Sequence, residues 1–399
     1  MYYTHQVLPI NIEDHPLGKK LPKATEAPSI HPGPQEFRAF AAREDAPATL
    51  EDFIYQDIPQ LSLHVTSFNN ATLVGLLWPH TLMDVMGQQA LLRGWSLVLA
   101  DREAEVPPML GAREDAMCVA TDASAESEEF ELGQKRLRGW HMLKLGLRFA
   151  WDLISNRVVE TRTIFLPKKV VNELCHQAQC DLAANGTGNK RTFISEGDVL
   201  TAWATREVAS SLPTPRPVTV LHALNARFRL TALAEASGVY VQNMALAAFT
   251  PMAPNVATGP LGPAALENRR HLMMQSREGQ VLAFMRELRR EPESGRDPGL
   301  VVCGESNALL ISFTNWTKAD FFNVADFGSA VVRGGETGQS RSNAPGTIVF
   351  HHAQSMRQNP AARNVFVVLG KDNSDNYWLT GILPPAAWTN IEGDLNRRR

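Results

Sequence analysis

The chain has 399 residues, of which 44% are hydrophobic and 20% are charged, and its formal net charge is −3 at pH 7. This is the composition of an ordinary globular protein with enough residues for two domains, and the small negative charge argues against partners such as nucleic acid or an anionic membrane. No stretch is long and apolar enough to span a membrane. Cys118, Cys175, Cys180 and Cys303 show no paired C-x-x-C spacing, which predicts free thiols and a cytoplasmic protein.

The N-terminal part of the chain predicts loops followed by a hairpin. The first 50 residues are rich in chain breakers, so we expect at most one short strand there, near Gln6–Ile12. Apolar and polar residues alternate over Leu61–Val65, which predicts a half-buried strand. The turn signal Asn69-Asn70 follows. The continuous apolar run Ala71–Trp78 then predicts a second strand, buried on both faces.

One histidine and one aspartate follow this hairpin, just before a predicted helix. His80 and Asp84 are four residues apart, and apolar residues then recur at helical spacing. The end of a strand before a helix is where side chains reach a crevice in an α/β fold. An imidazole is suited to take a proton near neutral pH. Asp84 could orient it, as in a triad, or pair with an arginine. H-x-x-x-D matches are common by chance, and such a histidine is more often structural, so the pair alone is weak evidence.

Beyond residue 100, strand and helix patterns alternate. Residues 111–133 are acidic and small, and they predict a linker because they can bury little apolar surface. The predicted strands are Val158–Leu166, Val218–Asn225, a segment after Asn243, Leu309–Thr314, Gly346–Phe350, Asn364–Leu369 and one from Tyr377. The predicted helices are Leu137–Ile154, Pro167–Leu182, one beginning at Ser195, Leu266–Leu288 and one ending at Asn396. This interleaving predicts an α/β fold with a largely mixed sheet.

Two local patterns carry further expectations. The helix over residues 137–154 places four large apolar residues on one face, namely Trp140, Leu143, Leu147 and Trp151. His351 and His352 suggest metal ligands at first sight. Adjacent residues of a strand point to opposite faces, however, which argues against a metal site there.

Several ordered stretches together carry a family resemblance. His80-Thr-Leu-Met-Asp84-Val-Met-Gly87 is similar to an H-x-x-x-D-x-x-G signature, and Ala325-Asp326-Phe327-Gly328 is similar to the start of a D-F-G-W-G signature. The stretches that match lesser motifs between them are Ser195–Trp203, Asn225–Leu230, Tyr240–Asn243 and Thr314–Trp316. Over residues 60–399 the chain thus resembles the BAHD acyltransferase family, in particular its fungal branch, within the chloramphenicol acetyltransferase-like superfamily.

The sequence departs from the family pattern in two places. The second signature continues as Ser329-Ala330, so its usual Trp and last Gly are absent. In the family this motif lies away from the catalytic pocket, and the expected function is therefore kept. His80 also comes earlier than usual, because family members carry a further N-terminal segment of sheet and helix. We therefore expect the first domain to be short at its start.

The resemblance implies two domains of chloramphenicol-acetyltransferase-like topology. Residues 1–111 would form the first domain, 112–157 a crossover, and 158–399 the second domain. A solvent channel would run between the domains, with His80 at its middle. An acyl-CoA co-substrate would enter from one face and a small-molecule acceptor from the other. The resemblance implies a monomer with no tightly bound cofactor and no metal.

The resemblance also implies a role for each site residue. His80 would act as general base on an acceptor hydroxyl or amine. Thr314 or Trp316 would donate to the oxyanion, although strand-end packing explains Trp316 equally well. Asp84 would pair with Arg227, which favours structural support over the triad.

Alternatives remain for the partner of Arg227 and for the activity. Alternation puts Arg227 and Arg229 on the same side, so a shared acidic partner is an equal alternative. Asp326 would be a second loop-fixing anion in a structural salt bridge.

Two other functions stay open: a cyclisation or elimination promoted by His80 on the same fold, and a non-catalytic binding protein.

Overall fold

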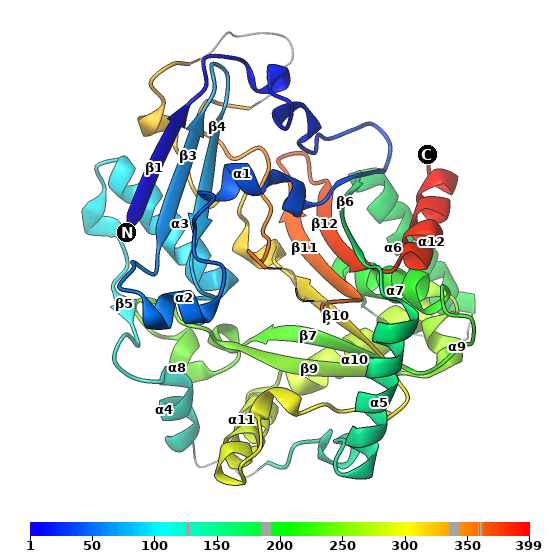
Figure 1. Ribbon diagram of the computed structural model, residues 1–399. Coiled ribbons are helices and arrows are strands. Elements are labelled where there is room, and N and C mark those ends of the chain that lie inside the picture. The colour runs from blue at the N-terminus through cyan, green and yellow to red at the C-terminus, as the bar shows by residue number, and fades with distance from the viewer. Residues whose placement is uncertain (125–127, 185–192, 335–342, 358, 360) are drawn as a thin grey trace.

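The strands of the protein form three sheets in a computed structural model that describes residues 1–124, 128–184, 193–334, 343–357, 359 and 361–399 (Figure 1). The central sheet has the order β2-β6-β12-β11-β10-β7-β9, and two smaller sheets have the orders β1-β3-β4 and β5-β8. The strands are β1 Tyr2–Val7, β2 Ser29–Pro32, β3 Ser62–Ser67, β4 Thr72–Leu77, β5 Met109–Leu110, β6 Glu160–Leu166, β7 Val218–Asn225, β8 Val239–Tyr240, β9 Ala245–Met252, β10 Leu309–Asn315, β11 Val365–Lys371 and β12 Tyr377–Leu383.

The α-helices alternate with these strands along the chain. They are α1 Arg38–Ala41, α2 Leu50–Tyr55, α3 Val85–Leu99, α4 Ala116–Asp122, α5 Trp140–Ser155, α6 Lys168–Ala184, α7 Glu196–Ala209, α8 Thr231–Ala234, α9 Pro254–Ala257, α10 Leu261–Gln275, α11 Glu278–Glu293 and α12 Pro385–Arg397. Parallel and antiparallel pairs both occur in the central sheet. The predicted α/β class with a mixed sheet is therefore confirmed. No helix in the described ranges is long and apolar enough to cross a membrane.

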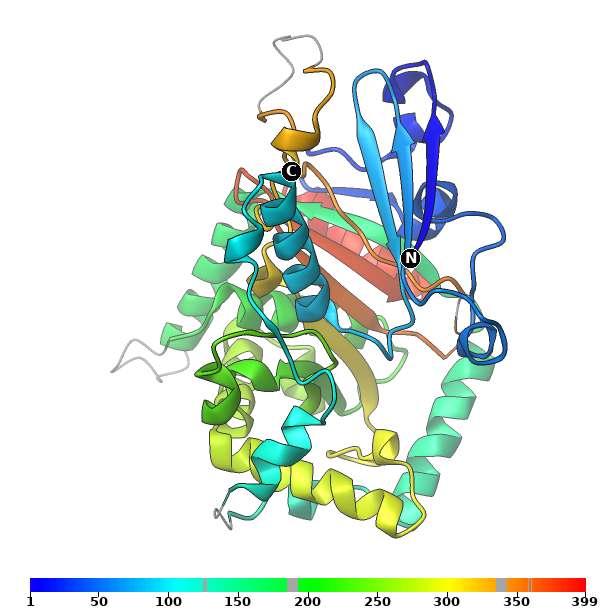
Figure 2. The ribbon, with the colours of Figure 1, turned by 90° about the vertical axis from the view of Figure 1, so that its left-hand side faces the viewer.

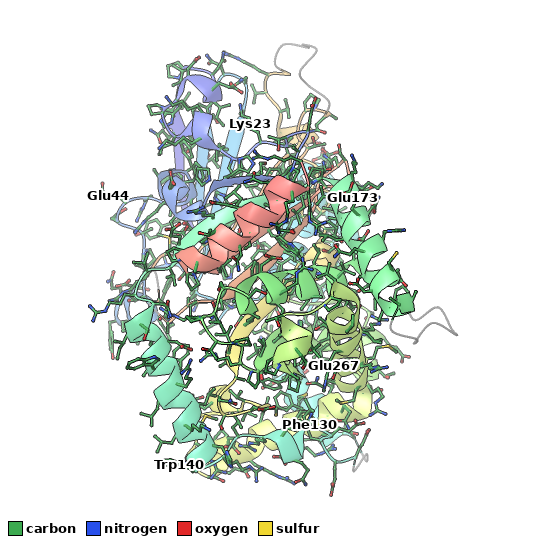
Figure 3. The ribbon with its side chains drawn as sticks, turned by 90° about the vertical axis from the view of Figure 1, so that its right-hand side faces the viewer. Lys23, Glu44, Phe130, Trp140, Glu173 and Glu267 are labelled. Carbon is green, nitrogen blue, oxygen red and sulfur yellow. The ribbon has the colours of Figure 1, made fainter. Side chains whose placement is uncertain are left out.

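One face of the central sheet is covered by α6, α7, α10 and α12 (Figure 3). Helix α7 is buried along most of its length because it lies between the sheet and the other three helices. The indole N–H of its Trp203 donates to Asp394 of α12 at 2.9 Å. Ser195 and Asp198 form a capping box at the start of α7, where the sequence predicted a helix to begin.

The other face of the central sheet points toward the three-stranded sheet and α3. Along β12, Tyr377, Leu379 and Leu383 pack into the helix-covered core, whereas Thr380 and Ile382 face the opposite side. The segment that follows β10 packs on α3, where Leu92 contacts a cluster that includes Phe321. In Figure 2 this segment, coloured yellow to orange, runs beside the three-stranded sheet. A cleft is left between the two sheets.

Four sequence predictions about elements are wrong. The first 50 residues were expected to hold at most one short strand, near Gln6–Ile12, but they hold two, β1 at Tyr2–Val7 and β2 at Ser29–Pro32. The Ala71–Trp78 run was expected to be buried on both faces, but β4 is an edge strand of the three-stranded sheet and Val74 is 41% exposed. The predicted strand Gly346–Phe350 is only an isolated bridge between Thr347 and Asp326. The single helix predicted over Leu266–Leu288 is two helices, because the chain becomes extended at Arg277.

Helix α5 forms where the sequence predicted a helix, but its large apolar residues point outward. Trp140 is 70% exposed and Trp151 is 60% exposed, and Figure 3 shows Trp140 at the edge of the molecule. The helix is held instead by its other side. The carboxylate of Asp152 accepts a hydrogen bond from Arg216, and Arg363 donates to the carbonyl oxygen of Asn156 at 2.8 Å.

Segments of the chain interleave around the predicted domain boundaries. Strand β2, from the first segment, pairs with β6 at the edge of the central sheet. We keep the division into a first domain over 1–111, a crossover over 112–157 and a second domain over 158–399 as a proposal. Residues 125–127 of the proposed crossover lie outside the described residues.

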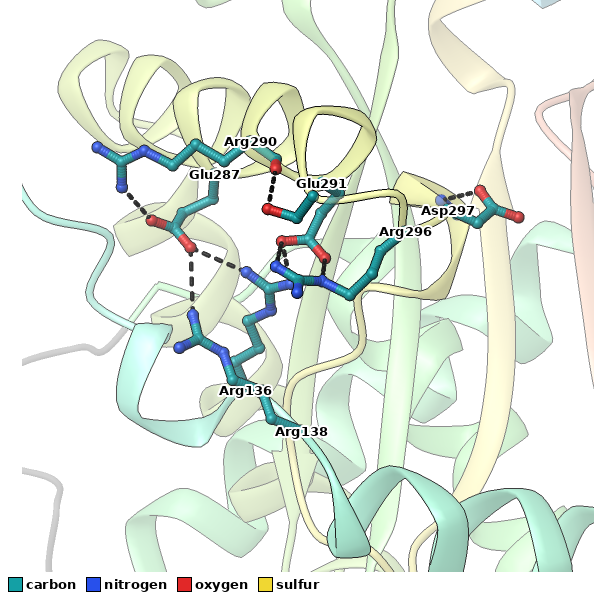
Figure 4. Close-up of polar contacts among 9 residues, drawn as sticks. Arg136, Arg138, Glu287, Arg290, Glu291, Arg296 and Asp297 are labelled. Carbon is teal, nitrogen blue, oxygen red and sulfur yellow. Dashed lines mark hydrogen bonds and ion pairs between the residues drawn. The ribbon is translucent and has the colours of Figure 1, made fainter.

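Buried ion pairs join the crossover segment to α11 (Figure 4). The guanidinium of Arg136 donates to Glu287 at 2.9 Å and lies 2.6 Å from Glu291. Arg296 binds the same Glu291 carboxylate at 2.7 Å. The hydrogen bonds from Arg296 and then from Arg136 lower the pKa of Glu291 to about 2. The carboxylate therefore stays charged well below its ordinary range.

We predict that Glu291→Gln destabilises the protein near neutral pH and that this difference disappears in acid. A carboxyl whose pKa is lowered on folding stabilises the native state above its unfolded pKa of 4.5, and this contribution is lost as the pH falls toward 2. Urea unfolding of wild type and variant at several pH values measures the effect. Glu293→Gln, at an exposed position on the same helix, is the control. A stability difference that is independent of pH would contradict the assignment.

Candidate active site

His80 lies in the loop between β4 and α3, three residues after β4, and faces the cleft between the two sheets. The cleft has a volume of about 2560 Å³ and is lined from both sides. The His80 side chain is exposed to it, and the imidazole makes no hydrogen bond to any described residue. Its carbonyl oxygen accepts a hydrogen bond from the side-chain amide of Asn243 at 2.6 Å. The backbone of His80 is thus tied to the loop before β9 while the ring stays open to a ligand.

Asp84 caps α3 and binds an arginine from the other side of the cleft. One carboxylate oxygen accepts from the backbone N–H groups of Met86 and Gly87 at 3.0 and 3.1 Å. The guanidinium of Arg227 donates to both oxygens, at 2.8 and 3.0 Å. The N–H of Met244 adds a further bond at 2.9 Å. Both partners are buried, so the two charges neutralise each other away from water.

Arg227 is held just as completely as its partner. Its Nε donates to the carbonyl oxygen of Tyr240 at 3.1 Å, and a terminal nitrogen donates to the carbonyl oxygen of Gln242. Asn225 accepts from both the backbone and the side chain of Arg227. The start of α3 is therefore fixed to the ends of β7 and β9, and His80 with it.

The glycine of the first signature is required by a close backbone approach. A Cβ placed on Gly87 would lie 2.1 Å from the carbonyl oxygen of Val241 and 2.7 Å from Cβ of Met83. Backbone atoms cannot yield to such a contact. The spacing of His80, Asp84 and Gly87 thus sets the docking of α3 on the loop over residues 240–244.

The structure brings the predicted pair Asp84 and Arg227 into contact. Both Asp84 oxygens are occupied by the arginine and by backbone N–H groups, so neither orients the His80 ring. Arg229 does not share this partner and forms no ion pair with a described residue. Asn243, which holds His80, was not among the predicted site residues, although it lies inside the recognised stretch Tyr240–Asn243.

Thr314 and Trp316 line the same cleft as His80. Thr314 is next to last in β10, and its hydroxyl makes no hydrogen bond to a described residue. Trp316 packs edge-on against Phe321 with ring centroids 6.3 Å apart, and its backbone N–H donates to Val368 at 2.9 Å. No described group accepts from its indole N–H. Both predicted donors are thus available to a ligand, while the Trp316 ring also packs.

Asp326 fixes its loop without a charged partner in the described part of the chain. Its carboxylate accepts from the N–H of Gly328 at 2.7 Å, and the hydroxyl of Ser96 on α3 bridges its backbone N–H and C=O at 2.9 and 3.1 Å. The salt bridge predicted for Asp326 is therefore not found there. The next residue, Phe327, packs edge-on against Trp95 of α3 with centroids 5.2 Å apart.

The adjacent histidines His351 and His352 lie in a loop, whereas the sequence prediction treated them as residues of a strand. His351 hydrogen-bonds the carbonyl oxygen of Leu369 at 3.1 Å, and burial lowers its pKa to about 3. In the described ranges, no group of three His, Cys, Asp or Glu residues could hold a metal ion.

No family model matches the sequence. Relatives that align over nearly the whole chain nevertheless assign it to a family. The O-acetyltransferase PaAT-2 of Phomopsis amygdali is 35% identical over 408 residues, covering 99% of this chain and 82% of that protein. The acetyltransferase pyiB of Pyricularia grisea is 35% identical over 394 residues, covering 98% and 77%. A relative named as the transcriptional regulator calD, of Penicillium decumbens, is 32% identical over 400 residues, covering 98% and 79%.

Solved structures show the same fold. TRI101 of F. graminearum, in complex with coenzyme A and T-2 mycotoxin, superposes with a TM-score of 0.61 at 14% identity, covering 100% of this chain and 81% of that one. The relatives named as acetyltransferases, together with this fold, define an enzyme of the acyl-transfer class. The chain belongs to the BAHD family of acyl-CoA-dependent acyltransferases.

We predict that Asp84→Asn lowers the free energy of unfolding by about 3–5 kcal/mol, because it leaves the buried Arg227 without its counter-charge. Asparagine still caps a helix, so the cap itself is preserved. Asp115→Asn is the matched control, since Asp115 caps α4 in the same way but is exposed. Denaturant unfolding of both variants measures the difference. Equal, small effects would show that the ion pair does not hold the site together.

Proposed function

We propose that the enzyme transfers an acyl group from acyl-CoA to a hydroxyl or amine of a small secondary-metabolite acceptor, with His80 as general base. The observation that carries this proposal is the open imidazole of His80 in the cleft, tethered through Asn243 and fixed by the pair of Asp84 and Arg227. Relatives named as acetyltransferases favour acetyl as the acyl group. The T-2 mycotoxin bound to TRI101 supports a secondary metabolite as acceptor.

The reaction follows from what each residue can donate or accept. The His80 imidazole takes the proton of the acceptor hydroxyl as its oxygen attacks the thioester carbonyl carbon. The carbonyl oxygen becomes an oxyanion, to which the Thr314 hydroxyl or the Trp316 indole N–H donates. Collapse of the tetrahedral intermediate breaks the carbon–sulfur bond. The CoA thiolate then takes the proton from the imidazolium, and His80 is neutral again.

A non-catalytic binding protein is the second candidate, because two relatives are named as transcriptional regulators, calD and sdnM. The exposure of His80 to a large cleft favours catalysis over this candidate. A cyclisation or elimination at His80 would need no CoA thioester. Mass spectrometry of products formed with and without acetyl-CoA therefore separates it from acyl transfer.

We also propose a cytoplasmic monomer. The four free cysteines support the compartment, because thiols stay unpaired in reducing surroundings. The monomer rests on the family resemblance.

We predict that His80→Ala lowers kcat by about 10²–10⁴-fold, the usual contribution of general-base catalysis. Thiol release from acetyl-CoA in the presence of a panel of hydroxylated acceptors measures the rate. Acetyl-CoA should still raise the midpoint of thermal unfolding of the variant, because the proposed loss is in chemistry and not in CoA binding. His141→Ala, an exposed histidine on α5, is the control. Unchanged turnover by His80→Ala would refute the proposed mechanism.

A further inference from the structure

Three residues that line the cleft carry buried polar atoms without a hydrogen-bond partner among the described residues. They are the hydroxyl of Thr380, Nδ1 of His352 and the amide nitrogen of Gln354. Thr380 is only 5% exposed. A buried polar group without a partner costs about 1–3 kcal/mol, so native proteins rarely keep several together unless something binds them.

The strand register places Thr380 in a row with another predicted site residue. Thr314 on β10 pairs with Val367 on β11, and Val367 pairs with Thr380 on β12. Thr380 in turn pairs with Thr163 on β6, and Thr163 with His31 on β2. Registered partners point to the same face of a sheet. Thr314, Val367 and Thr380 therefore form a continuous strip of the cleft floor.

His352 lies over the same end of this floor. Its ring stacks on Phe37 with centroids 5.7 Å apart and meets Phe350 edge-on at 5.6 Å. Phe350 in turn contacts Trp378, two residues before Thr380 on the same face of β12, at 5.0 Å. Gln354 follows His352 by two residues in the same loop. These ring contacts bring the loop that carries His352 and Gln354 to the aromatic part of the cleft beside Trp378, on the strand of Thr380.

We propose that Thr380, His352 and Gln354 form a subsite that binds an uncharged oxygen of the acceptor, remote from the oxygen that is acylated. This inference rests on the proposed acyl-transfer function and assigns its acceptor class. The unpartnered nitrogen of Gln354 is a donor, so it requires an acceptor oxygen such as a ketone, ester or ether. The aromatic surroundings fit an apolar skeleton around that oxygen.

The charge state of the three residues favours an uncharged ligand group. Burial lowers the pKa of His352 to about 4, so its ring is neutral at physiological pH. A neutral imidazole, an amide and a hydroxyl bind neutral oxygens and offer no counter-charge to a carboxylate or phosphate. The subsite therefore suits an uncharged acceptor oxygen better than the CoA phosphates.

The sheet geometry also sets the size of the acceptor. One strand separates Thr314 from Thr380, so the two side chains lie about 10 Å apart across the floor at the usual strand spacing. With Thr314 at the reacting centre, the acceptor carries two oxygen functions about 10 Å apart on an apolar skeleton. A 3-hydroxysteroid with a 17-ketone has this form, and it serves as a probe.

The test compares two steroids that differ only in the remote oxygen, dehydroepiandrosterone and androst-5-en-3β-ol. Quenching of tryptophan fluorescence measures their Kd values for the full chain in the presence of CoA. We expect the ketone to bind about 3- to 10-fold more tightly to the wild type, as one or two neutral hydrogen bonds would supply. Thr380→Val and Gln354→Leu should each reduce this ratio toward one, whereas Thr380→Ser, which keeps the hydroxyl, should preserve it.

Several outcomes would overturn the subsite without touching the proposed function. Equal affinities of the two steroids for the wild type would mean that water alone satisfies these atoms. A ratio unchanged in both Thr380→Val and Gln354→Leu would remove these residues from the site. Failure of both steroids to bind would overturn the ligand class, provided that acetyl-CoA still raises the unfolding temperature. Loss of the acetyl-CoA response as well would count against the proposed function itself.

Discussion

The buried ion pair of Asp84 and Arg227 is the interaction on which the arrangement of the site depends. Removing two charges from water costs several kcal/mol for each ion, and their attraction offsets this only when the remaining donors and acceptors are also satisfied. Here both oxygens of Asp84 are used, and Arg227 donates to two backbone carbonyl groups besides. The pair joins residues 143 positions apart in the chain, so it ties α3 to β7 and β9.

Because of this tie, the position of His80 is set by the backbone and not by a bond to its own ring. Asn243 holds the His80 carbonyl oxygen, and Gly87 allows α3 to meet Val241 closely enough for Asp84 to reach Arg227. A triad aspartate would instead occupy a ring nitrogen. Both nitrogens of the His80 imidazole are left open to the cleft, as the proposed proton transfer from the acceptor to the CoA thiolate requires.

Elements whose signal is local were the ones that could be predicted from the sequence. β7 spans the expected residues, and the capping box at Ser195 marks the start of α7. Elements that depend on distant partners were mispredicted. An apolar run such as β4 is compatible with a central or an edge strand, and only pairing across the chain decides between them. The break at Arg277 is not marked by a proline, and the nearby Gly279 lies inside the next helix.

The same distinction separates the two parts of the candidate site. His80, Asp84 and Arg227 could be named because fixed spacings around them match a family signature. Thr380 and His352 could not, since the contacts between Phe37, His352 and Phe350 are made only after two distant segments fold onto the sheet.

One weak signal for the second part was nevertheless present in the sequence. Thr380 is a polar residue within a strand that is otherwise apolar, on the face opposite the helix-covered core. Valine would fill the same volume as this threonine, and an oxygen or nitrogen of a ligand would give its hydroxyl a partner. The structure places the cleft at that position, on the same strip of sheet as Thr314.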